Sequence, residues 1–255
     1  MVRAPLLMVQ LLALFVTPPS RQAAPAAPAA PAFDKTLSDP AALGFLTGVV
    51  DKRLYSLEAA GATKLVATVH AAWEGRPDAP PPLDFEVACD YLAGSVTSRP
   101  LATPAEAVKP LLASIYALGH TVFAFLPSRA GGSFVLTTAQ EDELTRIDYR
   151  PRNSASNEKG HSEWHKKDGT PVRRKFESMT AQGTVAVQEV VPEYTEADGR
   201  LLLKSMRAAD PKVRLSLEFE YAKVDGFRVL KRLVQTTDDV RIVLDFKVKI
   251  EAAPK

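Results

Sequence analysis

Two histidines that are close in sequence are the first candidates for chemistry. His161 and His165 lie four residues apart, with Glu163 between them. Metal ligation requires imidazole nitrogens that converge about 2 Å from the ion, and a spacing of four achieves this on a helix. Here the segment reads as a loop that enters a strand, where positions four apart are separated by about 13 Å. A pair of surface histidines is the simpler interpretation, so we expect no metal site and no cofactor.

The only cysteine is the second candidate. Cys89 could act as a nucleophile if His70 or His120 served as its base and Asp84 or Asp90 oriented that base. However, Cys89 alternates in phase with the apolar residues of its segment, and a buried free cysteine commonly behaves as a small hydrophobe. We therefore favour a structural role for it.

Acidic residues in the same segment offer a third possibility. Asp84, Glu86 and Asp90 fall on the polar face of the predicted strand, where they most simply keep that face hydrated. A hydrolase with paired carboxylates is the alternative. No cluster compels a reaction, so we predict that the chain is not an enzyme and keep a hydrolase as the third hypothesis.

One concentration of basic residues lies beside a tryptophan. Its members are Lys159, His165, Lys166, Lys167, Arg173, Arg174 and Lys175. They could meet an anionic head group or an acidic partner, or they could form the solvated edge of a sheet, where lysines discourage strand addition. Trp164 favours a portal, because an amphipathic ring suits the mouth of an apolar cavity. We single out four residues as a possible basic portal: Lys166, Lys167, Arg173 and Lys175.

The elements that must position these residues are clearest at the end of the chain. Apolar and polar residues alternate over residues 213–221 and again over 240–250, which is typical of strands with one apolar face. Asp225-Gly226 is a tight-turn dipeptide, so Val213 to Ile250 is predicted to form a three-stranded antiparallel meander. The middle strand alternates imperfectly, which indicates a bulge or a strand covered on both faces.

Two helical segments are predicted near the start. The first begins at Ser38-Asp39-Pro40, an N-cap pair followed by proline, and carries an apolar stripe to a stop at Gly61. The second begins at a capping box, Thr103 to Glu106, and ends at Gly119, and Pro110 should kink or split it. Further strands are expected at residues 64–73, 83–91, 121–126, 134–138, 144–149, 164–167, 172–177, 184–191 and 200–207.

These elements predict an α+β, mostly β fold. Consecutive strands without helices between them form an antiparallel sheet, and a single sheet of about 10 to 11 strands must curve or split. We predict an unclosed β-barrel in which two helical segments cover the concave face. The sheet and helices would form one domain, residues 38–255.

The first residues predict export. Arg3 precedes an apolar run from Leu6 to Val16, which is too short to span a bilayer and has the layout of a secretory signal peptide, residues 1–26. An Ala/Pro-rich leader follows, residues 27–37. No cysteine is near the cleavage region to carry a lipid anchor, so we expect a periplasmic or secreted protein with no integral membrane span in the mature chain.

Charge narrows the choice of partner. Removing Arg3 and Arg21 lowers the basic residues from 32 to 30, which equals the 30 acidic residues. A formally neutral mature chain does not favour nucleic acid as a partner. We expect a monomer.

Two hairpins resemble a known family. The segment from Trp164 to Arg173 looks like the aromatic strand, Asp-Gly turn and following strand of the periplasmic carriers of outer-membrane lipoproteins and their lipoprotein-sorting-like relatives. Tyr221 to Phe227 resembles the aromatic, Asp-Gly and aromatic run that precedes the last strands in that group. The resemblance covers about Asp39 to Ile250 and implies an unclosed barrel that shelters a lipid or acyl chain.

The leading hypothesis is therefore an exported binding or carrier protein for a hydrophobic ligand, such as a lipid or the acyl chains of a lipoprotein. The alternative is a structural or protein-interaction module of the cell envelope with a filled core and an envelope protein as partner. For the leading hypothesis, the wall of the apolar cavity is predicted to include Trp164, Phe219, Tyr221, Leu244 and Phe246.

Overall fold

The structure is a computed structural model. It describes residues 38–75, 77–123, 127–128, 134–151, 159–179, 185–238 and 240–252. The predicted signal peptide and leader lie outside the described residues, as does most of the polar loop predicted between Arg150 and Gly160. Within the described ranges, no helix combines the length and the hydropathy that a bilayer crossing requires.

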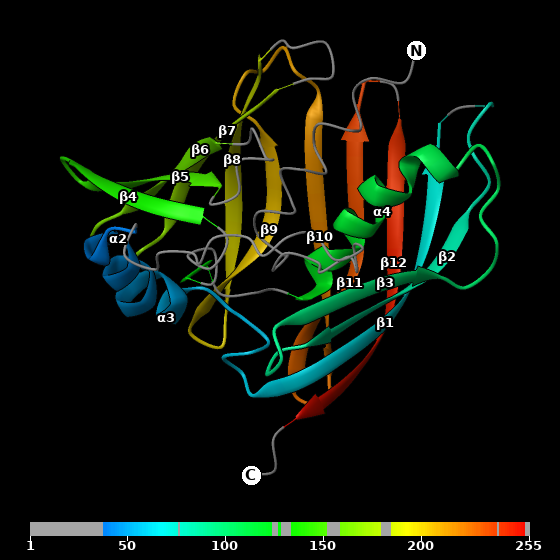
Figure 1. Ribbon diagram of the computed structural model, residues 1–255, viewed down its shortest axis with the longest axis horizontal. Coiled ribbons are helices and arrows are strands. Elements are labelled where there is room, and N and C mark those ends of the chain that lie inside the picture. Colours follow the sequence, from blue (N-terminus) through cyan, green and yellow to red (C-terminus); the bar gives the residue numbers. More distant parts are fainter. Residues whose placement is uncertain are drawn as a thin grey trace, which may run out of the picture.

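A single antiparallel sheet of 12 strands, in the order β3-β2-β1-β12-β11-β10-β9-β8-β7-β6-β5-β4, forms the body of the protein. The sheet curves around the helical segments and does not close, since β3 and β4 are its two edges (Figure 1). This confirms the predicted mostly β, unclosed architecture. The strands are β1 (Ala62–Glu74), β2 (Leu83–Asp90), β3 (Ser95–Pro100), β4 (Phe134–Glu141), β5 (Leu144–Pro151), β6 (Lys159–His165), β7 (Pro171–Met179), β8 (Val185–Ala197), β9 (Arg200–Ala208), β10 (Leu215–Val224), β11 (Phe227–Thr237) and β12 (Arg241–Ala252).

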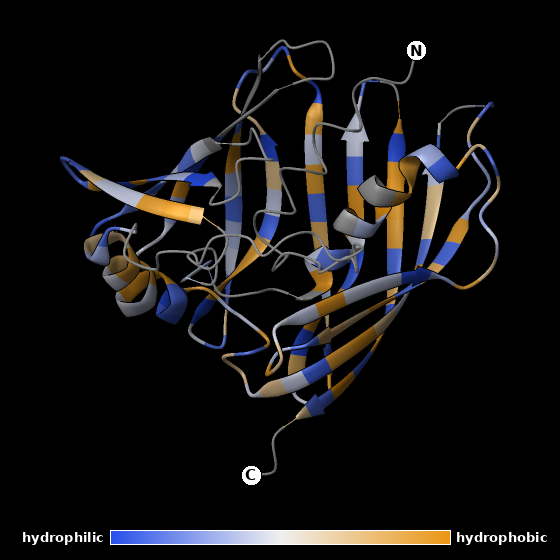
Figure 2. Ribbon diagram, viewed as in Figure 1, coloured by the Kyte–Doolittle hydropathy of each residue, from blue (hydrophilic) through white to orange (hydrophobic). Residues whose placement is uncertain are grey.

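Alternation of side chains builds one apolar face on this sheet. Along β2 buried residues alternate with more exposed ones, as period-two hydrophobicity requires, and Figure 2 shows the same banding on several strands. Strand register carries this face across the sheet: Ala71 lies opposite Leu244, Leu244 opposite Leu233, and Leu233 opposite Phe219. We call it the inner face, because the helical segments cover it.

The predicted irregularity of the middle strand is a bulge. The register between β10 and β11 shifts after Glu220, so that Phe219 lies opposite Leu233 but Tyr221 lies opposite Leu230. The extra residue lets both leucines join the inner face. Val234, which pairs with Val243 on the other face, is also buried, so both interpretations of this strand are confirmed.

Two helical segments cover opposite ends of the inner face (Figure 1). The first runs through α2 (Pro40–Phe45), η2 (Leu46–Val50) and α3 (Asp51–Arg53), and the second through η3 (Lys109–Leu111), α4 (Leu112–Gly119) and η4 (His120–Phe123). The predicted N-cap is present, because Ala41 N donates a hydrogen bond of 2.8 Å to Asp39 Oδ1. The number of helical segments and their place are thus as predicted.

The structure differs from the prediction at two helix boundaries and at one predicted strand. The first segment ends at Arg53 instead of Gly61, because Leu54 bridges Leu201 at the start of β9. The second begins near Pro110 instead of Thr103, since a proline without an N–H fits a first helical turn better than a helix interior. The strand predicted over residues 121–126 is wrong for 121–123, which form a 3-10 turn, and 124–126 lie outside the described residues.

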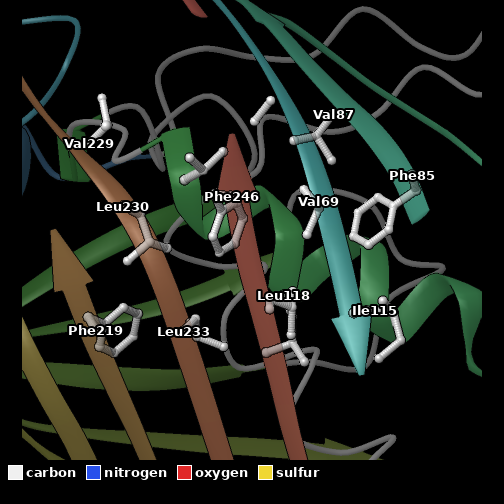
Figure 3. Packing of buried hydrophobic residues seen from close by; sticks show 14 of the residues in the cluster. Val69, Phe85, Val87, Ile115, Leu118, Phe219, Val229, Leu230, Leu233 and Phe246 are labelled. Carbon is white, nitrogen blue, oxygen red and sulfur yellow. The ribbon is translucent and has the colours of Figure 1, made fainter. Parts of the chain in front are cut away.

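The inner face is packed as two clusters. The large cluster lies under α4, where Ile115 and Leu118 face side chains of β1, β2, β11 and β12 (Figure 3). The small cluster lies under the first helical segment and contains Ala42, Leu46, Val50, Leu54, Leu136, Ile147, Trp164 and Leu201. Between them the inner face continues, and the candidate site lies there on strands β5 to β10.

Candidate functional site

The candidate site is centred on an arginine in the middle of the inner face. Val190 of β8 lies opposite Arg174 of β7, Arg174 opposite Ser162 of β6, and Ser162 opposite Ile147 of the small cluster. Successive residues of a strand point to opposite faces, so Arg174 points to the inner face while its neighbours Arg173 and Lys175 point to the outer face. A guanidinium therefore occupies a position that strand alternation otherwise gives to apolar residues.

Arg174 is almost completely buried, with 2% of its surface exposed. Its Cζ lies 5.3 Å from the centroid of the Trp164 ring, which is a cation–π arrangement. It also donates a side-chain hydrogen bond to Tyr194. Burial lowers the pKa of Arg174 to about 10, whereas the Tyr194 and Tyr149 phenols act in the opposite direction. The charge is thus desolvated and surrounded by aromatic side chains.

Two further tyrosines lie on the inner face, Tyr194 of β8 and Tyr221 of β10. Tyr194 and Tyr221 are only partly buried and keep accessible surface. Burial nevertheless raises the pKa of the Tyr194 phenol, and it also raises the pKa of the Tyr221 phenol. We define the arginine site as Arg174, Trp164, Tyr149, Tyr194 and Tyr221.

Gly160 determines the position of the Tyr149 ring in the arginine site. Tyr149 lies opposite Gly160 and donates its hydroxyl proton to the carbonyl oxygen of Lys175, at 3.1 Å, so its ring crosses β6. A Cβ at Gly160 would collide with both the Tyr149 hydroxyl and the Lys175 carbonyl. Only glycine permits this close approach of ring and backbone.

The structure separates the side chains that were predicted to form the cavity wall. Trp164 belongs to the small cluster, where it is buried beside the first helical segment. Phe219, Leu244 and Phe246 belong to the large cluster, and Leu244 has no exposed surface. Tyr221 packs against the edge of that cluster. Because it keeps accessible surface, it could still contact a ligand.

The predicted basic portal is divided between two faces and a turn. Lys166 and Lys167 lie in the β6–β7 turn, whose Gly169 packs closely against Val49 and Val50 of the first helical segment. Arg173 is on the outer face and forms an ion pair with Glu189 at 2.8 Å. Lys175 is also on the outer face. The four residues therefore do not gather at one mouth.

Lys175 instead lines a polar pocket of about 500 Å³ formed by β4 to β7. Arg146 holds Asp148 there at 2.7 Å, and His161 lies 3.5 Å from Glu163. Burial lowers the pKa of His161, and the charge of Arg146 adds to this effect. The lining residues are Val135, Thr137, Arg146, Asp148, Tyr149, Arg150, Gly160, His161 and Lys175.

The histidines do not gather metal ligands. His165 lies at the end of β6, four residues from His161 along the same extended strand. Among the residues that the structure describes, no group of three or more His, Cys, Asp or Glu side chains could hold a metal ion.

The cysteine is separated from one proposed base. Cys89 is buried opposite Leu65 on the inner face, whereas His70 pairs with Asp84 at 2.8 Å on the exposed outer face, the face that also carries Glu86 and Asp90. Strand parity thus excludes His70 as a base for Cys89 in this structure.

The other proposed base contacts a serine. His120 Nε2 lies 2.5 Å from Ser98 Oγ of β3, a contact that the sequence interpretation missed because β3 was not predicted. Burial lowers the pKa of His120 to about 4, so the ring is neutral at physiological pH.

Sequence reasoning also overlooked the centre of the site. Arg174 was grouped with its basic neighbours, although it shares strand parity with Phe176 and not with Arg173 or Lys175. Tyr194 likewise continues the parity of Val190 and Pro192. The alternation of faces along the strand could have distinguished Arg174 from Arg173 and Lys175, because it places Arg174 on the apolar side.

Comparisons with known proteins give a fold likeness only. No family model and no curated protein matches the chain. It is similar to the crystal structure of a LolA superfamily protein from Nitrosomonas europaea, with a TM-score of 0.35 and 10% identity over 84% of this chain and 94% of that one. It is also similar to a DUF1329 family protein from Desulfovibrio piger, with a TM-score of 0.30 and 8% identity over the same shares.

Proposed function

We propose that the chain is an exported, non-enzymatic protein that binds a hydrophobic ligand, such as a lipid or the acyl chains of a lipoprotein. The observation that carries this proposal is the apolar inner face of an unclosed sheet, on which the partly exposed aromatic side chains of Tyr194 and Tyr221 lie between two ends that helical segments cover. An unclosed sheet with helices at both ends leaves its middle strands as the place where a ligand can enter and be surrounded by apolar atoms.

Apolar burial would supply most of the affinity. At about 25 cal/mol per Å², removing about 300 Å² of acyl chain from water contributes about 7 kcal/mol, which corresponds to micromolar binding before ordering costs. No directional chemistry is needed for this contribution. It suits a carrier, which must both hold and release its cargo.

Different inner-face residues would have different parts in binding. Trp164, Phe219 and Tyr221 are our candidates for the wall of the ligand site. Leu244 and Phe246 form the packed floor of the large cluster, where they stabilise the sheet under α4. A charged substitution at Phe246 should therefore unfold this end of the protein before it affects binding.

Export is proposed from the sequence alone. Arg3, the apolar run Leu6 to Val16 and the following small residues carry it. Mass spectrometry of the protein recovered from an exporting host should show a chain shortened by about 26 residues. A full-length chain retained in the cytoplasm would contradict export without affecting the binding proposal.

Native mass spectrometry of the protein purified from an exporting host tests ligand binding. We expect a bound lipid that organic extraction removes. Tyr221→Asp should abolish retention, because a carboxylate on the apolar inner face opposes the binding of an apolar chain. The matched control is Ser216→Asp, which adds the same charge to the other face of the same strand, β10. If neither the wild-type chain nor the Ser216→Asp control carries a lipid, the result would instead support a structural or protein-interaction module of the cell envelope with a filled core.

A further inference from the structure

The polar pocket on the outer face of β4 to β7 has no part in the proposed function. These strands lie at the β4 edge of the sheet (Figure 1). Val135 of the edge strand is on the outer face and is nevertheless buried, and only 15% of the His161 side chain is exposed. The outer face is thus hollowed at this point. The pocket volume of about 500 Å³ lies within the range of about 300 to 1,000 Å³ for small-molecule sites.

Cationic side chains outnumber anionic ones in the lining of the polar pocket. Arg146, Arg150 and Lys175 are the cations, and Asp148 is the one carboxylate among the described lining residues. Arg146 donates to Asp148 Oδ1 from Nε at 3.0 Å and from Nη2 at 2.7 Å, so these two charges offset each other. The charges of Arg150 and Lys175 remain as an excess in the lining.

The other carboxylates near the polar pocket have cationic partners of their own. Glu189 forms an ion pair with Arg173 at 2.8 Å, and Glu163 lies 3.9 Å from the same guanidinium. Glu141 lies 3.9 Å from Arg146. None of these three carboxylates lines the pocket, so the excess positive charge faces the space inside it.

His161 adds a neutral donor to the lining. Burial lowers its pKa, and the charges of Arg146 and Lys175 act in the same direction. Glu163 and Asp148 act in the opposite direction without reversing the result. The imidazole is therefore mainly neutral at pH 7, and its N–H can donate a hydrogen bond to an anion.

We propose that the polar pocket binds a small oxyanion, a phosphate or carboxylate group, whose charge is met by Arg150 and Lys175. Arg150 is exposed and has no ion pair among the described residues, so its planar fork can meet two oxygens of such a group. Thr137 of β4 adds a hydroxyl to the lining. Binding here is independent of the proposed function, because the pocket and the arginine site are on opposite faces of the sheet.

Isothermal titration calorimetry of the full chain at constant ionic strength tests this site. The probes are inorganic phosphate, glycerol phosphate, succinate and butane-1,4-diamine, which has the chain length of succinate but two positive charges. We expect at least one of the three anions to bind at least about 10-fold more tightly than the diamine. Glycerol phosphate that binds as tightly as phosphate would indicate a group carried on a larger molecule, such as a lipid head group. Tighter binding of phosphate itself would indicate the free ion.

The imidazole signal of His161 in proton NMR shows where the anion binds. A bound anion should raise the pKa of His161, because it opposes the charge of Arg146. His70 is the internal control, since it is exposed on β1, six strands away from β7 in the sheet, and its signal should not respond. His161→Gln assigns the signal.

Two variants assign the binding to the lining cations. Arg150→Gln should weaken the tightest anion about 10- to 100-fold, the range for a charge-assisted hydrogen bond, and Lys175→Met should also weaken it. Arg214→Gln is the matched control: Arg214 is an exposed arginine between β9 and β10, it does not line the pocket, and its loss changes the net charge equally. Circular dichroism confirms that each variant is folded.

The possible outcomes separate this site from the ligand binding proposed for the inner face. Failure of every anion to bind, or equal binding of succinate and the diamine, would overturn the proposed site. Equal weakening in Arg150→Gln and Arg214→Gln would also overturn it, since the effect would then come from overall charge. A His161 pKa that is unchanged at saturation would mean that the anion binds elsewhere. None of these results alters lipid retention, which is measured separately. If Lys175→Met fails to fold, Arg150→Gln at its exposed position still decides the matter.

Discussion

The large cluster and the arginine site lie on the same face of the same sheet but are built from different residues. Under α4, Phe85, Leu233 and Leu244 have no exposed surface, and apolar side chains fill the space between sheet and helix (Figure 3). Over β5 to β10, aromatic rings lie around a buried cation, and three rings of the arginine site, those of Tyr149, Tyr194 and Tyr221, keep accessible surface. The first arrangement buries apolar surface almost completely, whereas the second places a desolvated cation among aromatic rings.

This difference suits different roles for the two regions, stabilisation of the fold in the large cluster and the proposed ligand binding at the arginine site. A region that only stabilises the fold gains nothing from a buried guanidinium, because apolar residues of similar volume are commonly as stable or more so. A region that binds a ligand can retain such a group at some cost. We therefore expect substitutions in the large cluster to change stability and substitutions in the arginine site to change binding.

Leu244→Ala should give the largest effect. Removing a fully buried leucine leaves a cavity among packed neighbours, so the free energy of unfolding should fall by about 3 kcal/mol, within the usual range of about 2 to 5. Urea denaturation measures this loss. Val66→Ala is the control, because Val66 is 38% exposed on the outer face of β1 and should lose far less. Equal losses at the two positions would mean that the large cluster is not packed as described.

His120 should make the same end of the protein sensitive to acid. Burial lowers its pKa from the ordinary histidine value of 6.5 to about 4 in the folded chain. Between these values the unfolded chain binds more protons, so stability is fully present above pH 6.5 and falls as the pH drops through 4. The loss should reach about 3 kcal/mol.

Urea denaturation at a series of pH values measures this dependence. His120→Gln removes the titrating group, so the slope between pH 6.5 and pH 4 should flatten, although the variant loses the contact with Ser98. An unchanged slope would show that carboxylates elsewhere, and not His120, govern acid sensitivity.

Gly160→Ala should perturb the arginine site by about 1 to 3 kcal/mol. The added Cβ would meet the Tyr149 hydroxyl and the Lys175 carbonyl, and the backbone carbonyl cannot rotate away. Thermal unfolding measures the cost. Gly44→Ala in α2 is the control, since nothing lies within 4 Å of its added Cβ and alanine favours a helix. A neutral Gly160→Ala would show that Tyr149 is free to move.

The sequence predicts the sheet well because its information is local. Period-two alternation and Asp-Gly turns depend on adjacent residues, and the structure has positive φ at both residues of the Asp198-Gly199 and Asp225-Gly226 turns. Even the bulge in β11 left a trace, since Leu230 and Val234 break the alternation. The pairing of β1 with the last strand, β12, was not predicted, because nothing near Lys64 or Ile250 encodes a partner so distant in sequence.

The site is less predictable for a related reason. Arg174 lies between two other basic residues, Arg173 and Lys175, and only the register of β7 shows which of them faces inward. Helix ends are equally dependent on distant contacts: the stripe of the first segment continues to Leu57, but Leu54 leaves the helix to bridge β9. Both features depend on tertiary contacts that the local pattern does not contain.

Arg174→Met should give the smallest change in stability and is the sharpest test of the comparison. If the buried cation contributes little to folding, a side chain of similar length without charge should change the free energy of unfolding by less than about 1 kcal/mol, or even increase it. Chemical denaturation of the ligand-free protein measures this, with Leu244→Ala beside it. A loss as large as that of Leu244→Ala would instead make Arg174 part of the folding core. The two ends of the inner face would then differ in composition but not in role.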